Sequence, residues 1–284
     1  MIADRLFEAD GSFHYPAAGA HQPGVRAVHL DGVRGDTVLV NGAPWPVAAV
    51  DGARHRLRIL NASNARSYEL GFDPPVSLDL IGSDGGLLDR PIELAKLVIA
   101  PGERYDVIVD FGRYPPGTAV TLVNGFDKDG PTGRIMRFDV GGRVADDSEV
   151  PPVLVPALDE PGDPAERRNF RFLAGQGGLP ATINARTFRM DRADATPRLG
   201  TTEHWLVSGD PEHPIHVHLG QFRVLERSGG PPDPQDHGWK DTVLLRGGTV
   251  LLAVRFAGHR GRYVMHCHNL EHEDMMMMTN IEVI

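Results

Sequence analysis

Six of the thirteen histidines in the sequence lie in two short motifs near its C-terminal end, and one of these motifs also holds the single cysteine. The first motif is HPIHVH, residues 213–218, and the second is HCHNLEH, residues 266–272. Successive side chains of a strand point to opposite faces, so second-neighbour histidines share a face. If each motif lies on a strand, the cysteine faces away from the two histidines that flank it.

Two histidine pairs therefore define one expected face. His216 and His218 form the first pair, and His266 and His268 form the second. Side chains two residues apart on a strand are separated by about 7 Å, which suits ligands of adjacent metal ions. On neighbouring strands, the two pairs would offer four imidazoles to the same side of a sheet.

Cys267 needs further ligands on its own face. His272 follows it by five residues and Met277 follows His272 by five, a spacing that a strand end running into a loop or short helix can fold around one ion. His213 precedes its own histidine pair and can come from a loop at the same pole. Two imidazoles, one thiolate and a weak thioether form the set that selects copper for electron transfer, whereas closed zinc sites use more thiolate or carboxylate.

A packed core position is the usual role of a single histidine or a free cysteine in a strand. The joint occurrence of the two motifs argues against that role for the motif residues. Seven histidines stand alone, and we expect none of them to bind metal: His14, His21, His29, His55, His204, His237 and His259. Asp241 could orient a ligand histidine or cap a turn, and we favour the structural role.

Short segments rich in β-branched residues, bounded by Gly, Pro, Asn or Asp, make up most of the chain. In YDVIVDF, residues 105–111, apolar and acidic side chains alternate as in a half-buried strand. A run dense in Pro, Gly and acidic residues over 141–168 indicates an interdomain connection. We predict an all-β chain of two Greek-key β-sandwich or barrel domains, residues 1–145 and 169–284, joined by a linker over 146–168.

The charge balance limits the kinds of partner. The net charge of −9 argues against nucleic acid or an anionic membrane surface, since both require a basic face. No run of 18 apolar residues exists, and the first twenty residues lack a basic start followed by an apolar stretch. We expect no nucleic acid and no membrane as partner, and localisation stays open.

The two motifs resemble those of a known family. HPIHVHLGQFRVL and HCHNLEHEDMMMM are similar to the last two of the four copper motifs of multicopper oxidases, in the bacterial laccase and bilirubin oxidase branch that includes spore-coat laccases. ILNASNARSYEL, IGSDGGLL and APGERYDVIVDF resemble the middle domain of three-domain members. The resemblance covers the whole chain and implies cupredoxin domains, copper as cofactor, a phenol-like or metal-ion reducing substrate, and oxygen reduced to water.

The resemblance also divides the ligands among three kinds of copper. In this resemblance the ligands of the blue type 1 copper are His213, Cys267 and His272, with Met277 axial or, in another loop register, Met276 or Met278. The ligand of the type 2 copper is His216. The ligands of the type 3 pair are His218, His266 and His268. In such enzymes the cysteine passes electrons to its flanking histidines, so the resemblance makes Cys267 catalytic. Glu273 matches a position linked to proton delivery, with a solvated acidic residue as the alternative.

One departure from the family pattern limits the function. The family's trinuclear cluster takes eight histidines, four of them from two His-x-His pairs in a first domain, and residues 1–212 contain no such pair. We expect that first domain to be absent. The chain is then either an oxidase that needs an N-terminal cupredoxin domain from elsewhere, or a mononuclear blue-copper protein for electron transfer or copper binding without oxygen reduction. A copper-free relative is disfavoured because all eight available ligands are present.

Overall fold

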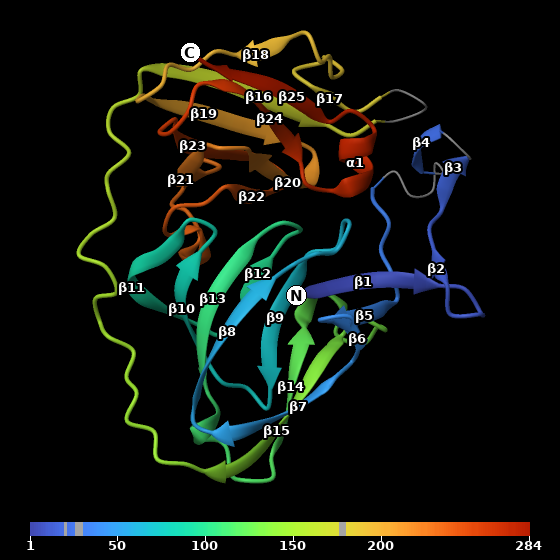
Figure 1. Ribbon diagram of the computed structural model, residues 1–284, viewed down its shortest axis with the longest axis vertical. Helices are drawn as coiled ribbons and strands as arrows, with labels where there is room; N and C mark the ends of the chain where they lie inside the picture. The colour runs from blue at the N-terminus through green and yellow to red at the C-terminus, as the bar shows by residue number, and fades with distance from the viewer. Residues whose placement is uncertain (20–21, 26–30, 176–179) are drawn as a thin grey trace. The chain divides into compact units, whose positions relative to one another are not determined.

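The computed structural model describes residues 1–19, 22–25, 31–175 and 180–284. They form two compact units, one made of Met1–Tyr15 with Arg34–Ala157 and the other of Pro16–Val33 with Leu158–Ile284. Strands dominate both units (Figure 1). The predicted all-β class is confirmed.

Three sheets build the first unit, with strand orders β2-β1-β5-β6, β11-β10-β13-β8 and β12-β9-β14-β15-β7. Its strands are β1 (Ile2–Phe7), β2 (Phe13–His14), β5 (Thr37–Val40), β6 (Ala43–Pro44), β7 (Val47–Gly52), β8 (Arg54–Leu60), β9 (Tyr68–Asp73), β10 (Leu78–Ser83), β11 (Gly86–Leu94), β12 (Leu97–Ile99), β13 (Arg104–Asp110), β14 (Ala119–Asn124) and β15 (Arg134–Arg143). Two 3₁₀ turns, η2 (Phe111–Arg113) and η3 (Gly125–Asp127), interrupt them.

The strand β13 shows why the sequence pattern predicts this fold. Tyr105, Val107 and Val109 are buried in the core of the first unit, and the residues between them are half-buried. Antiparallel pairing of β13 with β8 and β10 holds this alternation in register. Apolar side chains on one face of each strand thus assemble a continuous core, and their removal from water is the main favourable term in folding.

The described residues of the second unit form two five-stranded sheets, with orders β17-β16-β19-β23-β21 and β18-β25-β24-β20-β22, and the two-stranded sheet β3-β4. Its strands are β3 (Ala17–Gly19), β4 (Gln22–Val25), β16 (Glu166–Leu173), β17 (Thr182–Ile183), β18 (Ala193–Ala195), β19 (Thr202–Gly209), β20 (Pro211–Val217), β21 (Gln221–Arg227), β22 (Thr242–Arg246), β23 (Thr249–Arg255), β24 (Gly261–Cys267) and β25 (Met278–Val283). The 3₁₀ turn η4 (Pro234–Asp236) and the helix α1 (Leu270–Asp274) complete it.

Both five-stranded sheets contribute to one core. Trp205 and Leu252 come from the first sheet, and Ile215, Met265 and Ile281 from the second, and all five are fully or almost fully buried. The unit is therefore a two-sheet sandwich. Cys267 belongs to the same core, so the thiol lies on the inner face of its sheet.

The two units differ from the predicted division 1–145, 146–168 and 169–284 at two places. Residues 16–33 group with the second unit rather than with the chain that surrounds them. Strand β16 begins at Glu166, inside the predicted linker. Parallel pairing with β19 extends β16 to that residue, and the Arg168 guanidinium forms an ion pair with Glu203 on β19 (Nε to Oε2, 2.6 Å).

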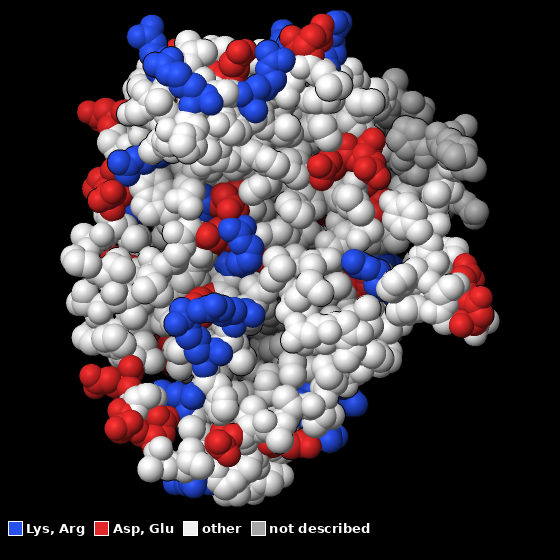
Figure 2. Space-filling view, in the orientation of Figure 1, with Lys and Arg blue, Asp and Glu red and all other residues white. Residues whose placement is uncertain are grey.

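Charged side chains are spread over the face drawn in Figure 2. Basic and acidic groups alternate there, and the described residues of this face form no continuous basic surface. Among the described residues, no helix combines the length and the apolar composition needed to cross a membrane.

Candidate metal centre

The antiparallel pair β20–β24 carries most of the predicted ligands. His216 lies directly opposite His266, and Ile215 lies opposite Cys267. Ile215 and Cys267 are fully buried in the core of the second unit, so the histidine pair faces the other side of the sheet. Strand alternation thus turns the Cys267 side chain away from the face that His266 shares with His216.

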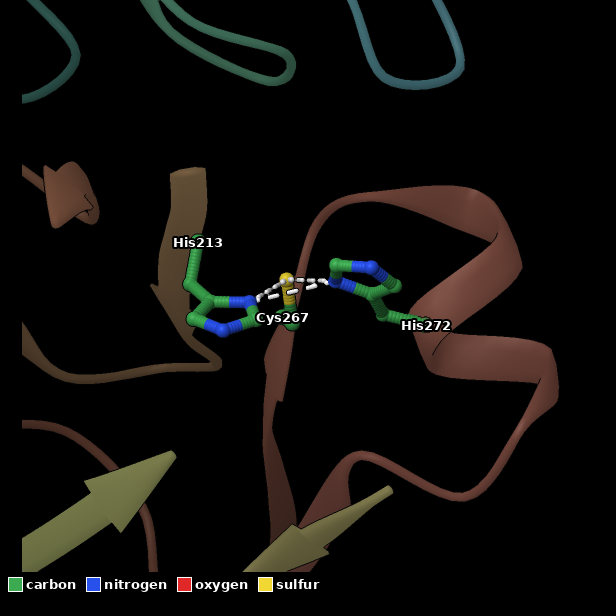
Figure 3. A group of neighbouring side chains, drawn as sticks. All are labelled: His213, Cys267 and His272. Carbon is green, nitrogen blue, oxygen red and sulfur yellow. Dashed lines mark hydrogen bonds between the residues drawn. The ribbon is translucent and has the colours of Figure 1, made fainter. Parts of the chain in front are cut away.

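Three side chains converge on the inner side of this pair (Figure 3). Cys267 Sγ lies 3.4 Å from His213 Nδ1 and 3.6 Å from His272 Nδ1, and the two Nδ1 atoms are 3.1 Å apart. His213 comes from β20, Cys267 from the end of β24, and His272 from α1. A point equidistant from the three atoms lies about 2 Å from each, the length of a bond from a metal to nitrogen or sulfur.

Asp210 sets the proton position on His213, and no motif in the sequence predicts this contact. The Nε2–H of His213 donates to Asp210 Oδ1 at 2.9 Å, because a carboxylate oxygen can only accept. Nδ1 therefore keeps its lone pair and directs it at Cys267 and His272. Burial lowers the pKa of His213, and the Asp210 carboxylate partly opposes that shift. The neutral, ligating imidazole is the favoured form.

The thiol of Cys267 is fully buried, and burial raises its pKa well above the ordinary value. The nearby carboxylates of Glu273 and Asp210 act in the same direction. A thiolate is costly here without a compensating positive charge. A metal ion supplies that charge and displaces the thiol proton of Cys267. The three donor atoms are therefore better suited to hold a cation than to surround a protonated thiol.

The three candidate axial methionines differ in burial. Met277 is fully buried and lies in the same core cluster as Cys267, whereas Met276 is 44% exposed with a left-handed backbone (φ 77°). Met278 already belongs to β25, where it pairs with His266 on the opposite strand. The backbone of Met277 bonds to both ligand segments: its carbonyl accepts from Cys267 N–H, and its N–H donates to the His272 carbonyl.

Four histidines gather on the other face of the β20–β24 pair. His216, His218 and His266 offer ring nitrogens that all lie within 4.8 Å of one another, and His218 Nε2 is 3.1 Å from His266 Nε2. The ring of His268 is 5.6 Å from that of His266 and 5.8 Å from that of His216. The structure thus brings together all four predicted histidines, with His268 at the edge of the group.

Hydrogen bonds from the Nδ1 atoms orient two of these rings. His216 Nδ1–H donates to the carbonyl of Asp241 at 2.9 Å, and His266 Nδ1–H donates to the carbonyl of Cys267 at 3.0 Å. Each bond leaves Nε2 with a free lone pair directed into the group. Asp241 therefore contacts a candidate ligand, which favours the orienting role over the purely structural one that its sequence context suggested.

Glu273 lies beside the histidine group rather than beside Cys267 Sγ. Its Oε2 is 3.3 Å from His266 Nδ1, and this contact is the main cause of its lowered pKa. Its side chain is 33% exposed, so the carboxylate connects the buried imidazole with the surface. The proton-delivery role that the sequence resemblance suggests for Glu273 stays a prediction.

Asn269 and Glu271 hold the short helix that carries His272. Asn269 caps α1, its Oδ1 accepting from the N–H groups of Glu271 and His272. The carboxylate of Glu271 is fully buried and accepts from Val33 N–H at 3.0 Å, and Asn269 Nδ2 donates to the carbonyl of Asp31. Residues 31–33, far away in the sequence, thus brace the ligand loop. The capping pattern is visible in the sequence, but the contacts to 31–33 are not.

The isolated histidines lie outside both groups where the structure describes them. His14 Nδ1 contacts a carboxylate oxygen of Glu8, His55 Nε2–H donates to the Asp51 carbonyl at 3.1 Å, and His204 is half-buried with no hydrogen-bond partner at Nδ1. Neither metal group of the described residues includes any of them. His21 and His29 lie outside the described residues.

The fold and these two groups define a β-sandwich protein with two candidate metal-binding groups. The family model described as multicopper oxidase matches residues 155–284, and a second one with the same description matches residues 11–133. The chain belongs to the multicopper oxidase family, whose cofactor is copper. This identifies both sandwich units as cupredoxin-like, as predicted.

Curated relatives and solved structures agree on the family. The chain is 38% identical to a laccase of Bacillus subtilis and 37% identical to a bilirubin oxidase of Albifimbria verrucaria, matching over 100% and 88% of its length. McoA, a multicopper oxidase of Aquifex aeolicus, superposes with a TM-score of 0.87 at 32% identity over the whole chain. The chain spans 61%, 48% and 64% of these three proteins, respectively.

Proposed function

We propose that this chain is the part of a copper oxidase that accepts electrons from a reducing substrate and passes them toward an oxygen-reducing centre. The observation that carries the proposal is the pair of side-chain groups on opposite faces of β20–β24, with His266 and Cys267, adjacent in sequence, in different groups. The relatives named laccase and bilirubin oxidase support an organic reducing substrate such as a phenol. A metal ion is the other substrate class in this family.

His213, Cys267, His272 and Met277 would hold a mononuclear blue copper. Bound there, copper supplies one-electron redox chemistry. The chain contributes a dry site, since all four side chains are buried, and a fixed lone pair on His213 Nδ1. A buried, rigid donor set suits electron transfer because few groups must rearrange when the charge changes.

The chain also supplies a connection between the two groups. Cys267 is covalently joined to His266 and His268, and its carbonyl accepts the hydrogen bond from His266 Nδ1. Sγ faces the first group while both neighbouring imidazoles face the second. An electron entering at the cysteine therefore has a path of a few bonds to either histidine.

His216, His218, His266 and His268 would contribute to a trinuclear copper site, with Glu273 delivering protons. His218 is exposed, so this group is open on one side. An open, histidine-lined face fits completion by further histidines from an N-terminal cupredoxin domain outside this sequence. The oxygen-reducing activity depends on that completion.

A second candidate function is electron transfer by the blue copper alone. One difference between the groups favours it. His213, Cys267 and His272 are all buried and all come from this chain, whereas the second group is partly exposed. The same blue-copper ligands serve both functions, and only the role of the second group differs.

Copper loading of the chain tests the blue site, with Cys267→Ser as control. We expect an intense visible charge-transfer absorption that the Ser variant lacks, and its absence from the loaded chain would refute both functions. Oxygen uptake is then measured with a phenol and a separately produced cupredoxin domain that carries two His-x-His pairs. Uptake that requires both Cys267 and the added domain supports the oxidase. A blue chain that consumes no oxygen with the added domain supports electron transfer alone.

A further inference from the structure

A pocket of about 680 Å³ opens on the first unit, on the face of its five-stranded sheet that points away from the core. Three side chains in register form its floor: Arg137 on β15 pairs with Thr121 on β14 and with Val47 on β7. None of the three belongs to the core cluster, whereas Phe138, next to Arg137, does. This volume lies within the range of small-molecule sites.

The wall formed by Lys128, Asp129, Gly130 and Pro131 is held by hydrogen bonds. Asp127 anchors it: its carboxylate accepts from both the N–H and the hydroxyl of the buried Thr132, and its carbonyl accepts from Gly130 N–H. The Thr132 hydroxyl is the main cause of the lowered pKa of Asp127. The wall is therefore ordered before any ligand arrives, which reduces the entropic cost of binding.

Trp45 forms the aromatic side of the pocket. The residue is 47% exposed, and its backbone is left-handed (φ 41°), a conformation that costs a bulky residue about 1 kcal/mol or more. The turn between β6 and β7 fixes it, because Trp45 N–H donates to the Val38 carbonyl and Pro46 O accepts from Arg137 N–H. A large aromatic surface is thus presented to solvent at the edge of a concave site, where it can stack on a flat ligand.

The pocket is basic on a chain of net charge −9. Lys128, Arg134 and Arg137 line it, against one carboxylate, that of Asp129. Arg137 forms an ion pair with Asp139, but no carboxylate of the described residues lies within ion-pair distance of Lys128 or Arg134. Two exposed cations beside an aromatic ring are complementary to an anion that carries a flat apolar body.

We propose that this pocket binds an aromatic carboxylate of one or two rings. The ring stacks on Trp45 and covers Val47, and the carboxylate accepts hydrogen bonds from Arg134 and Lys128. The site lies on the unit without the histidine groups, so it needs no copper. It adds a small-molecule site to the chain that is separate from the proposed redox function.

Calorimetric titration of the metal-free chain with 2-naphthoate tests the site, with uncharged 2-naphthamide as the matched ligand. We expect one naphthoate per chain, weaker binding at high salt, and much weaker binding of the amide. Arg134→Gln should lower the affinity about tenfold, since it removes a charge-assisted hydrogen bond. Trp45→Ala should weaken binding further, and Trp45→Phe should restore much of it because stacking is retained.

Arg58→Gln is the control, because Arg58 is 80% exposed on β8 and does not line the pocket. This variant should bind naphthoate like the unchanged chain. Three results would each overturn the proposal: no binding at millimolar naphthoate, equal binding of the amide, or an equal loss in the Arg58 and Arg134 variants. All of them are read on the metal-free chain, so they are independent of whether the copper function holds.

Discussion

His266 and Cys267 are adjacent on β24, yet their side chains serve different groups, and a hydrogen bond from His266 Nδ1 to the Cys267 carbonyl joins them (3.0 Å). The same strand pleat that buries the thiol turns the imidazole to the opposite face. The alternation of side chains between the two faces of a strand thus places two potential metal sites on opposite faces of β24, with ligands from adjacent residues.

The axial position of the blue site is tested by replacing each methionine with leucine, which nearly conserves volume. Met277→Leu should raise the reduction potential of the bound copper, because the weak thioether no longer stabilises the oxidised ion. Met276→Leu is the matched control, since its side chain is exposed. Spectroelectrochemistry of the copper-loaded variants measures the shift. A shift in the Met276 or Met278 variant, with none for Met277, would assign the axial position to that residue instead.

Asp210 should control the affinity for copper through His213. Asp210→Ala removes the acceptor that keeps the proton on Nε2, and outer ligand partners of this kind change metal affinity by about 10–100-fold. Asp210→Asn retains an acceptor oxygen without the charge, so its loss should be smaller. Competition with a copper chelator measures both affinities. Asp147→Ala, at an exposed position of the first unit, should leave the affinity unchanged. Equal effects in all three variants would contradict the role of Asp210.

Local patterns predicted the strands and the opposite orientation of Cys267 and its flanking histidines. Both depend only on the alternation of neighbouring side chains along one strand. In the β20–β24 pair, His216 lies opposite His266 on the shared face that alternation predicts for both. The grouping of residues 16–33 with the second unit could not be predicted, since the bond from Val33 to Glu271 joins positions 238 residues apart. Asp210 was likewise missed, because nothing local distinguishes a carboxylate that orients a ligand from one in a turn.

The histidine groups should make the stability of the metal-free chain depend on pH. Partial loss of hydration within the histidine group and the neighbouring imidazoles lower the pKa of His218 to about 4, and burial lowers those of His213 and His268. An unfolded histidine titrates near 6.5, so between about pH 6.5 and 4 the unfolded chain binds more protons. The free energy of unfolding should therefore fall as the pH falls through this window.

His218→Gln should make that fall shallower, since one of the shifted groups is removed. Denaturant unfolding at several pH values measures the slope, and comparing the variant with the unchanged chain cancels the contribution of the carboxylates. His259→Gln, an exposed histidine outside both groups, should keep the original slope. Identical slopes for the unchanged chain and the His218 variant would exclude a lowered pKa at His218.

The contact between Glu271 and Val33 should stabilise the ligand loop from a distance. Glu271→Ala leaves the N–H of the buried Val33 without this acceptor, which should lower the free energy of unfolding by about 1–3 kcal/mol. Glu271→Gln retains an acceptor oxygen and should lose less. Glu160→Ala, at an exposed position of the second unit, is the control and should be neutral. Because His272 follows Glu271 on α1, the Ala variant should also broaden the electron paramagnetic resonance spectrum of bound copper, and a stability loss without any spectral change would restrict Glu271 to a purely structural role.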